Sequence, residues 1–318
     1  MQFGAQVSCY RSIRGRLVQP GDTPLQWSDI RGVVETMEAG RWNSVWFADH
    51  FVPPPGPRED EPLPAFEGLS VVAAVAGLTQ RLQMGHLVIG NTYRNPGLVA
   101  KMAGTITAIS GGRVTMGIGA SWFEREHAAY GWDFPPMRER QDRLQEACGL
   151  LRRLLRDADP IDHQGDYYRL TEAPLSPGRE GAPIPILVGG TGEKRTLKTL
   201  AMHGDIFNLD GWAGAGMSLD LYKHKLSVLE KHCENVGRDP AEIRRTILMP
   251  AILTDDAGEA ADWVERVGPG TLAGGASELV DRLAEFIEFG VDEIMFGGMN
   301  VEPEDFIRFD EDVLSAFD

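Results

Sequence analysis

The sequence of 318 residues predicts a single α/β domain folded as a (β/α)8 TIM barrel with loop insertions. Two observations support this fold class: short apolar runs recur eight times, and helical patterns alternate with them without a linker. Most runs are continuously apolar, which is typical of parallel strands covered on both faces. They lie at 2–8, 44–48, 82–89, 113–117, 184–188, 205–209, 245–253 and 291–296. A doubly wound open sheet is the structural alternative.

Helical signals lie between these runs. In the clearest one, Asn95 provides an N-cap and Pro96 occupies the first helical position, where its fixed φ suits a helix. Further helices are expected at 28–40 with Ser28 as N-cap, at 137–155, and at 276–289 with Gly290 as a left-handed C-cap.

Two stretches are longer than the loops that usually connect strands and helices in a barrel. Residues 51–66 are rich in proline and charge, and they predict either a surface loop or a lid over the site. Residues 157–183 contain a strand-like piece at 166–170, which predicts a hairpin. Both count as insertions in one domain that spans residues 1–318.

Charge and cysteine content narrow the classes of partner. The net charge of −16 disfavours binding to nucleic acid or to an anionic membrane, because both rely on clustered Lys and Arg. The three cysteines are widely spaced, which favours free thiols in a reducing compartment. No signal-peptide pattern and no long apolar run occur, so a cytoplasmic location is expected. No metal-binding motif occurs either, and no metal site is expected.

Candidate chemistry lies where the predicted strands end, because barrel enzymes place their active sites at the carboxyl ends of the strands. The second strand ends in Asp49 and His50. Charged residues directly after a buried strand are costly unless they are hydrogen-bonded. His50 is a candidate proton donor or acceptor, because imidazole titrates near neutral pH. The alternative is that this pair only caps a loop.

The third and fourth strands end in residues that leave space for a planar ligand. Gly90 and Asn91 tolerate unusual backbone angles. Small residues also follow the fourth strand, and aromatic residues come after them; the aromatic residues either wall a substrate pocket or pack in the core. These candidates are Gly119, Ala120, Ser121, Trp122, Phe123 and Tyr130.

The fifth strand ends in a glycine-rich segment, 189–192, followed by Lys194 and Arg195. Glycines that lead into a helix expose backbone N–H groups, which bind anions. The two cations are expected in the first helical turn, where they oppose the helix dipole and make sense beside a phosphate. The alternative is a solvated surface pair.

Four segments carry a family resemblance across essentially the whole chain. They read SVWFADHF (44–51), TYRNPGLVAKMAGTITAISGGRVTMGIGASWFEREHAAYG (92–131), PILVGGTGEKRTLKTLAMHGD (185–205) and GGASELVDRLAEFIEFGVDEIMF (274–296). The chain resembles the luciferase-like monooxygenase family, and especially its branch that uses the 8-hydroxy-5-deazaflavin coenzyme F420.

The resemblance implies a ring system lying across the barrel mouth, with Asp49 beside the ring and His50 as the acid or base. It also implies a non-proline cis peptide within 87–90, behind the ring, and a phosphate-bearing tail near the glycine-rich segment. A homodimer is implied as well. The implied cofactor contacts are Asp49, Val88, Ile89, Gly90, Asn91, Gly119, Ala120, Ser121, Gly189, Gly190, Thr191 and Gly192.

The leading hypothesis is therefore hydride transfer between F420 and a small organic substrate. Two alternatives stay open: an FMN-dependent monooxygenase, and a non-catalytic flavin-binding protein on the same fold. The sugar-phosphate dehydrogenases of the family carry an acidic residue where this chain has Trp122, which disfavours a sugar phosphate as the substrate.

Overall fold

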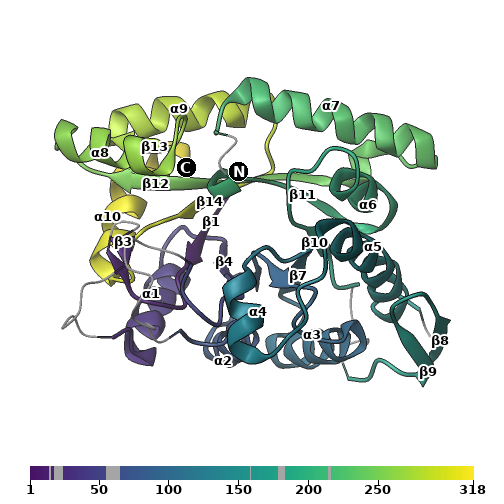
Figure 1. Ribbon diagram of the computed structural model, residues 1–318. Helices are drawn as coiled ribbons and strands as arrows, with labels where there is room; N and C mark the ends of the chain where they lie inside the picture. Colours follow the sequence, from purple (N-terminus) through teal and green to yellow (C-terminus); the bar gives the residue numbers. More distant parts are fainter. Residues whose placement is uncertain (14–15, 18–23, 55–64, 158, 178–182, 214–215) are drawn as a thin grey trace.

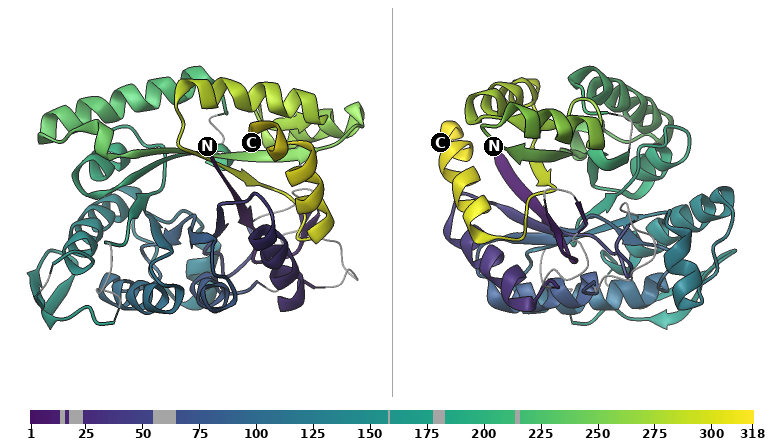
Figure 2. Two further views of the ribbon diagram at one scale, coloured as in Figure 1. Left: turned by 180° about the vertical axis from the view of Figure 1, so that it is seen from behind. Right: turned by 60° about the vertical axis from the view of Figure 1, so that its left-hand side comes forward.

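Eight parallel strands form a closed barrel in the computed structural model, and helices cover its outside (Figures 1 and 2). The structure describes residues 1–13, 16–17, 24–54, 65–157, 159–177, 183–213 and 216–318. In order around the barrel the strands are β1 (Gln2–Val7), β4 (Ser44–Phe47), β5 (Gln83–His86), β7 (Val114–Gly119), β10 (Ile186–Val188), β11 (Ile206–Asp210), β12 (Arg244–Leu253) and β14 (Glu293–Gly297). Pairing of β10 with β7 and of β14 with β1 closes the ring. The predicted barrel is confirmed.

The helices alternate with the barrel strands. They are α1 (Trp27–Ala39), α2 (Gly68–Leu78), α3 (Pro96–Ser110), α4 (Glu124–Tyr130), α5 (Met137–Leu154), α6 (Thr196–His203), α7 (Leu219–Val236), α8 (Ala257–Val267), α9 (Ala276–Phe289) and α10 (Pro303–Asp312). Short 3-10 helices are η1 (Gly211–Ala213), η2 (Pro240–Glu242) and η3 (Leu314–Phe317). No helix within the described ranges is both long enough and apolar enough to cross a membrane.

Shorter strands pair either with a barrel strand or with each other. β6 (Ile89–Gly90) pairs with β7, and β13 (Leu272–Gly274) pairs with β12. Two antiparallel pairs are β2 (Ser12–Ile13) with β3 (Arg16–Leu17), and β8 (Ile161–Gln164) with β9 (Arg169–Ala173). The last pair confirms the predicted hairpin, although the predicted piece 166–170 covers its turn and only the first two residues of β9.

Local signals set several helix ends. Asn95 caps α3 through its side chain and Pro96 follows, and Gly290 ends α9 with a φ of 93°, all as predicted. The cap predicted at Ser28 is wrong: α1 begins one residue earlier, after Gln26, whose backbone N–H donates to Asp29 at 2.9 Å. An acidic residue in the first turn replaces the hydroxyl cap there.

Apolar side chains also fill the inside of the barrel. Trp46, Leu187, Ile206, Leu248 and Met295 form this inner cluster together with Leu87. Polar residues close the end where the strands begin: the hydroxyl of Ser44 contacts Glu293, and Arg244 pairs with the same carboxylate at 3.1 Å. The opposite end, where the strands stop, is the barrel mouth, and the predicted site residues lie there.

The chain termini meet on one side of the barrel (Figures 1 and 2), and the rings of Phe3 and Phe317 lie 5.4 Å apart. The three cysteines are buried and free. Of the predicted insertion at 51–66, residues 55–64 lie outside the described residues, so the choice between loop and lid stays a prediction.

Candidate active site

The third barrel strand is interrupted at the mouth. β5 stops at His86, a cis peptide joins Leu87 to Val88, and β6 then pairs with β7 through Ile89 and Gly90. The non-proline cis bond implied by the family resemblance is confirmed. Gln6 of β1 donates from Nε2 to the carbonyl oxygen of Leu87 at 2.9 Å. The segment 87–90, here called the bulge, is thereby tied to a strand two places away around the barrel.

Val88 lies over two glycines of the neighbouring strands. A Cβ built at Gly189 would lie 2.7 Å from Val88 Cγ2, and a Cβ at Gly119 would lie 2.9 Å from the same atom. Both distances are shorter than a normal carbon–carbon contact. The small residues at these strand ends therefore have a packing role: they make room for the half-buried side chain of Val88. The side chain of Ile89 packs into the outer core instead.

Asp49 is fully buried and fully paired. Its carboxylate binds both terminal nitrogens of Arg94, at 2.7 and 2.9 Å, and accepts the backbone N–H of Gly90 at 3.1 Å. Arg94 also pairs with Glu67, which caps α2 by accepting the N–H groups of residues 69 and 70. This buried ion pair connects the end of β4 to the bulge, and it gives Asp49 a positioning role.

His50 pairs with Glu126, a completely buried carboxylate on α4. His50 Nδ1 lies 3.0 Å from Glu126 Oε1, and the same oxygen accepts the backbone N–H groups of Phe51 and Val52 at 2.9 and 3.1 Å. The hydroxyl of Tyr93 donates to Oε2 at 2.5 Å. Burial and the hydrogen bond to Glu126 raise the pKa of Tyr93, so this phenol keeps its proton.

These contacts decide the tautomer of His50. The other partners of Glu126 are all donors, so the carboxylate is satisfied as an ionised acceptor and His50 Nδ1 carries a proton toward it. Nε2 is then the ring nitrogen that can exchange a proton. The His50 side chain is 17% exposed, so its ring remains in contact with solvent.

Ser121 and Asn91 are fixed by hydrogen bonds rather than open. Ser121 adopts a φ of 62°, and its hydroxyl lies 2.6 Å from that of Thr92, which lies 2.7 Å from His127 Nε2. Asn91 donates from Nδ2 to the hydroxyl of Tyr168, which directly precedes β9 in the hairpin insertion, at 3.0 Å. The hairpin therefore supports the mouth from the outside, and Ala120 between these elements is half-buried.

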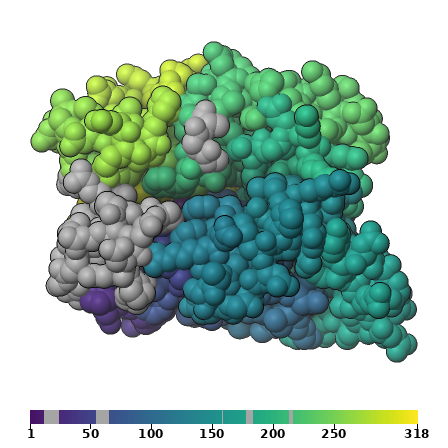
Figure 3. Space-filling model, viewed as in Figure 1, coloured from purple at the N-terminus to yellow at the C-terminus, as the bar shows by residue number. Residues whose placement is uncertain are grey.

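Two of the three predicted pocket aromatics adjoin His50. Trp122 is 57% exposed and stacks on the buried Phe123 with ring centres 5.1 Å apart. The His50 ring stands edge-on to both, at 5.8 and 6.2 Å. Tyr130 lies in a different aromatic group, stacked on Trp132 at 5.0 Å. Figure 3 shows the α4 segment at the front surface of the molecule.

The glycine-rich segment adjoins the bulge but differs from the prediction in one respect. Gly190 has a φ of 114°, and residues 193–195 form a turn before α6 begins at Thr196. Lys194 and Arg195 therefore precede the helix, and their predicted place in its first turn is wrong. Arg195 pairs with Asp142 at 2.6 Å, whereas Lys194 is exposed. Thr191 is half-buried and Gly192 is exposed.

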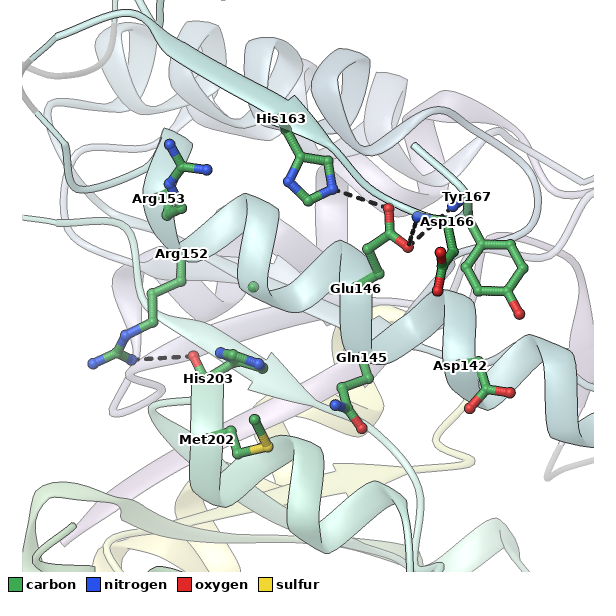
Figure 4. Close-up of a pocket in the computed structure, with 11 residues that line it drawn as sticks. Asp142, Gln145, Glu146, Arg152, Arg153, His163, Asp166, Tyr167, Met202 and His203 are labelled. Atoms are coloured by element: carbon green, nitrogen blue, oxygen red, sulfur yellow. Dashed lines mark hydrogen bonds and ion pairs between the residues drawn. The ribbon is translucent and has the colours of Figure 1, made fainter. Parts of the chain in front are cut away.

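A separate groove of about 870 Å³ lies outside the barrel, between α5, the hairpin and the end of α6 (Figure 4). Its polar groups are largely paired: Glu146 contacts His163 at 2.9 Å and accepts the N–H groups of residues 166–168. None of the predicted site residues lines it. The groove is therefore not part of the candidate active site.

Sequence reasoning missed Glu126, Arg94, Glu67 and Tyr93. Glu126 carried a detectable signal in its spacing, because Phe123, Glu126 and His127 lie at i, i+3 and i+4, which places them on one side of the cap and first turn of α4; the structure shows all three buried. A carboxylate on an apolar helix face needs partners. The partners of Arg94 lie 45 and 27 residues away in sequence, and no local pattern reveals them.

The fold and these contacts define a (β/α)8-barrel protein with its candidate active site at the carboxyl ends of the strands. The family model described as luciferase-like monooxygenase matches residues 7–278. The chain belongs to this family and is an enzyme of it.

Relatives and solved structures agree with this assignment. The chain is 27% identical over 307 residues to the F420-dependent glucose-6-phosphate dehydrogenase of Amycolatopsis mediterranei (strain U-32), covering 86% of this chain and 89% of the relative. It is 32% identical over 222 residues to a protein of the same name from Kineococcus radiotolerans, covering 69% and 62%. An F420-dependent secondary alcohol dehydrogenase in complex with an F420–acetone adduct has the same fold, with a TM-score of 0.80, 19% identity and coverage of 100% and 99%.

Proposed function

We propose that this protein transfers a hydride between coenzyme F420 and a small organic substrate at the barrel mouth. The relatives named above support the choice of cofactor. The observation that carries the proposal is the fixed pair of His50 and Glu126 beside the glycine-backed bulge.

The residues present fit a flat ring with an anionic tail. Gly90 and Gly119 have no room for a side chain, because Tyr93 and Val88 occupy that space, so the backbone of the bulge packs closely against its neighbours and presents a narrow surface to a ring. Val88 gives the ring an apolar support, and residues 190–192 with the exposed Lys194 offer N–H groups and a positive charge for the tail, whereas the N–H of Gly189 already donates to Ile118. When bound, F420 would supply the group that accepts or donates the hydride.

The side chains of this protein would exchange the proton, exclude water and position the bulge. His50, with its proton fixed on Nδ1 by Glu126, would exchange a proton through Nε2 with the oxygen of a substrate alcohol or carbonyl. Trp122 and Phe123 would cover the substrate beside His50 and keep water away. Asp49 and Arg94 would hold the bulge in place.

Titration of the purified protein with F420 and with FMN tests the cofactor. We expect saturable binding of F420, read by deazaflavin fluorescence, and weaker binding of FMN. Preferential binding of FMN, together with oxygen uptake when a reductase and substrate are present, would reject F420 in favour of a monooxygenase.

His50→Ala tests catalysis. We expect this variant to keep F420 binding and lose turnover. His163→Ala is a matched control, because His163 makes a similar pair with Glu146 at 2.9 Å but lies in the outer groove. Equal activity of the two variants would contradict the role of His50. Failure of the F420-loaded wild type to turn over a broad panel of alcohols and carbonyl compounds would contradict the proposed hydride transfer.

A further inference from the structure

Four of the eight barrel strands end in residues that take no part in the proposed cofactor contacts. The bulge, His50 and the glycine-rich segment belong to β4 through β10, one continuous arc of the barrel. The remaining arc runs β11, β12, β14, β1 and ends in residues 210–213, 250–254, 297–302 and 7–11. We call these ends the distal rim. They face the cofactor arc across the barrel mouth, where a substrate would meet the ring.

Asp210 points toward the interior at the distal rim. Strand residues alternate between faces, and two earlier residues of β11 face inward: Ile206 joins the inner apolar cluster, and Asn208 donates to Thr246 Oγ1 at 2.9 Å. Asp210 continues this face at the end of the strand. Its Oδ1 accepts the backbone N–H of Trp212 at 2.9 Å, and burial raises its pKa.

A donor and an acceptor flank Gly297 on the same rim. A Cβ built at Gly297 would lie 2.9 Å from Trp212 Nε1 and 3.4 Å from Gln6 Oε1. Gln6 is held in this orientation because its Nε2 donates to Leu87 of the bulge. The Trp212 side chain is 41% exposed. Together with the amide oxygen of Gln6, which directly precedes the segment 7–11, the distal rim thus offers an indole N–H and a carboxyl group.

Positive charge is scarce on this rim. Its four segments contain one Lys or Arg, which is Arg11. The guanidinium of Arg11 already pairs with Glu302 at 2.7 Å and Asp29 at 3.4 Å. Proteins recognise phosphate groups mainly through Arg and Lys, and a carboxylate repels them. The described segments of the rim therefore offer a phosphorylated substrate no Lys or Arg side chain that is free of a carboxylate partner.

We infer that the distal rim is a substrate subsite for an uncharged organic molecule with a hydroxyl or carbonyl group, and that Asp210 excludes phosphate esters from it. This inference rests on the proposed function, because the subsite is defined by the opposite arc that would hold F420. The substrate class inferred for this chain differs from that of its relatives, whose names specify glucose 6-phosphate.

The test uses the F420-loaded protein and two variants with the same change of charge. Asp210→Lys removes the carboxyl group from the rim, whereas Asp220→Lys makes the same change at an exposed position on α7. We expect wild type and Asp220→Lys to show no saturable binding or turnover of glucose 6-phosphate at millimolar concentration. We expect Asp210→Lys to bind it saturably, with a Kd at least about tenfold below the highest concentration at which wild type shows no saturation. Retained F420 fluorescence quenching verifies folding, and Asp210→Asn replaces the lysine variant if that fails.

The outcomes separate the two proposals. If wild type does not bind F420, the proposed function fails and this inference fails with it. If wild type binds F420 and turns over glucose 6-phosphate, the proposed function holds and the inference about the rim is overturned. Equal affinities of the two lysine variants for glucose 6-phosphate would also overturn it.

Discussion

Gly189 supports the bulge in a way that a single methyl group can test. Replacement by alanine would place Cβ 2.7 and 2.8 Å from the two γ-carbons of Val88. Optimal contacts between carbon atoms are about 3.5–4.0 Å, so the bulge or β10 must move by about 1 Å. Overpacking of this kind typically costs about 1–3 kcal/mol. We expect Gly189→Ala to lower the free energy of unfolding by that amount.

Val88→Ala should reverse most of this loss. The substitution alone removes two partly buried methyl groups and should cost about 1 kcal/mol. Combined with Gly189→Ala, it removes the atoms that the new methyl group meets, leaving a 3.3 Å approach to Cβ of residue 88. The double variant should then be more stable than the sum of the single effects predicts, by about 1–2 kcal/mol.

Urea unfolding and F420 titration of the four proteins complete the test. Gly189→Ala should also bind F420 at least about tenfold more weakly, because the displaced bulge is the proposed ring support. Gly77→Ala is the control: its Cβ meets nothing within 4 Å, and it should stabilise α2 by up to about 1 kcal/mol. Additive effects of residues 88 and 189, with wild-type F420 affinity, would refute the contact and its role.

Three further predictions follow from the buried polar groups. Glu126→Gln should lower kcat at least about tenfold with little change in F420 affinity, whereas Glu124→Gln on the exposed side of α4 should behave as wild type; equal kcat values would contradict the role of Glu126. Asp49→Asn should lower the free energy of unfolding by about 3 kcal/mol in urea, because it breaks a buried ion pair with Arg94; a loss below about 1 kcal/mol would argue against it. Burial lowers the pKa of His86 to about 4, below its unfolded value of about 6.5. The buried neutral imidazole therefore contributes its full share to the free energy of unfolding above pH 6.5, and this share is lost as the pH falls from 6.5 toward 4. Between pH 7 and pH 5, wild type should lose about 2 kcal/mol more than His86→Gln, measured by urea unfolding at both pH values; equal losses would contradict a buried neutral His86.

The barrel was predictable because its strands are buried on both faces. The run 184–188 is apolar throughout, and 291–296 has only Asp292 and Glu293 as charged residues, so both runs can be recognised without knowledge of tertiary contacts. The interruption of the third strand was not visible in the same pattern, since 82–89 reads as one continuous run. It came from the family resemblance. The place where α6 begins was also misjudged, because a turn at 193–195 separates it from the glycines.

The candidate site was predictable in its location but not in its connections. His50 and Asp49 stand out because charged residues follow a buried strand. Their partners come from other elements: Glu126 lies 76 residues from His50, and Arg94 lies 45 residues from Asp49. Such pairs depend on how the strands are ordered around the barrel. One sequence shows which side chains need a partner, but it does not show which partner they find.

The bulge explains why the two halves of the barrel mouth can serve different purposes. Asp49 binds its Gly90 N–H, Gln6 binds its Leu87 carbonyl, and Val88 packs on Gly119 and Gly189. Residues from several strands are thus fixed by one short segment, so a change there disturbs all of them. The distal rim is held by separate contacts, such as the ion pair of Arg11 with Glu302 at 2.7 Å, and these do not involve the bulge. Substitutions at Asp210 or Trp212 can therefore alter substrate choice while the cofactor side keeps its geometry, which is the division of labour that our two proposals require.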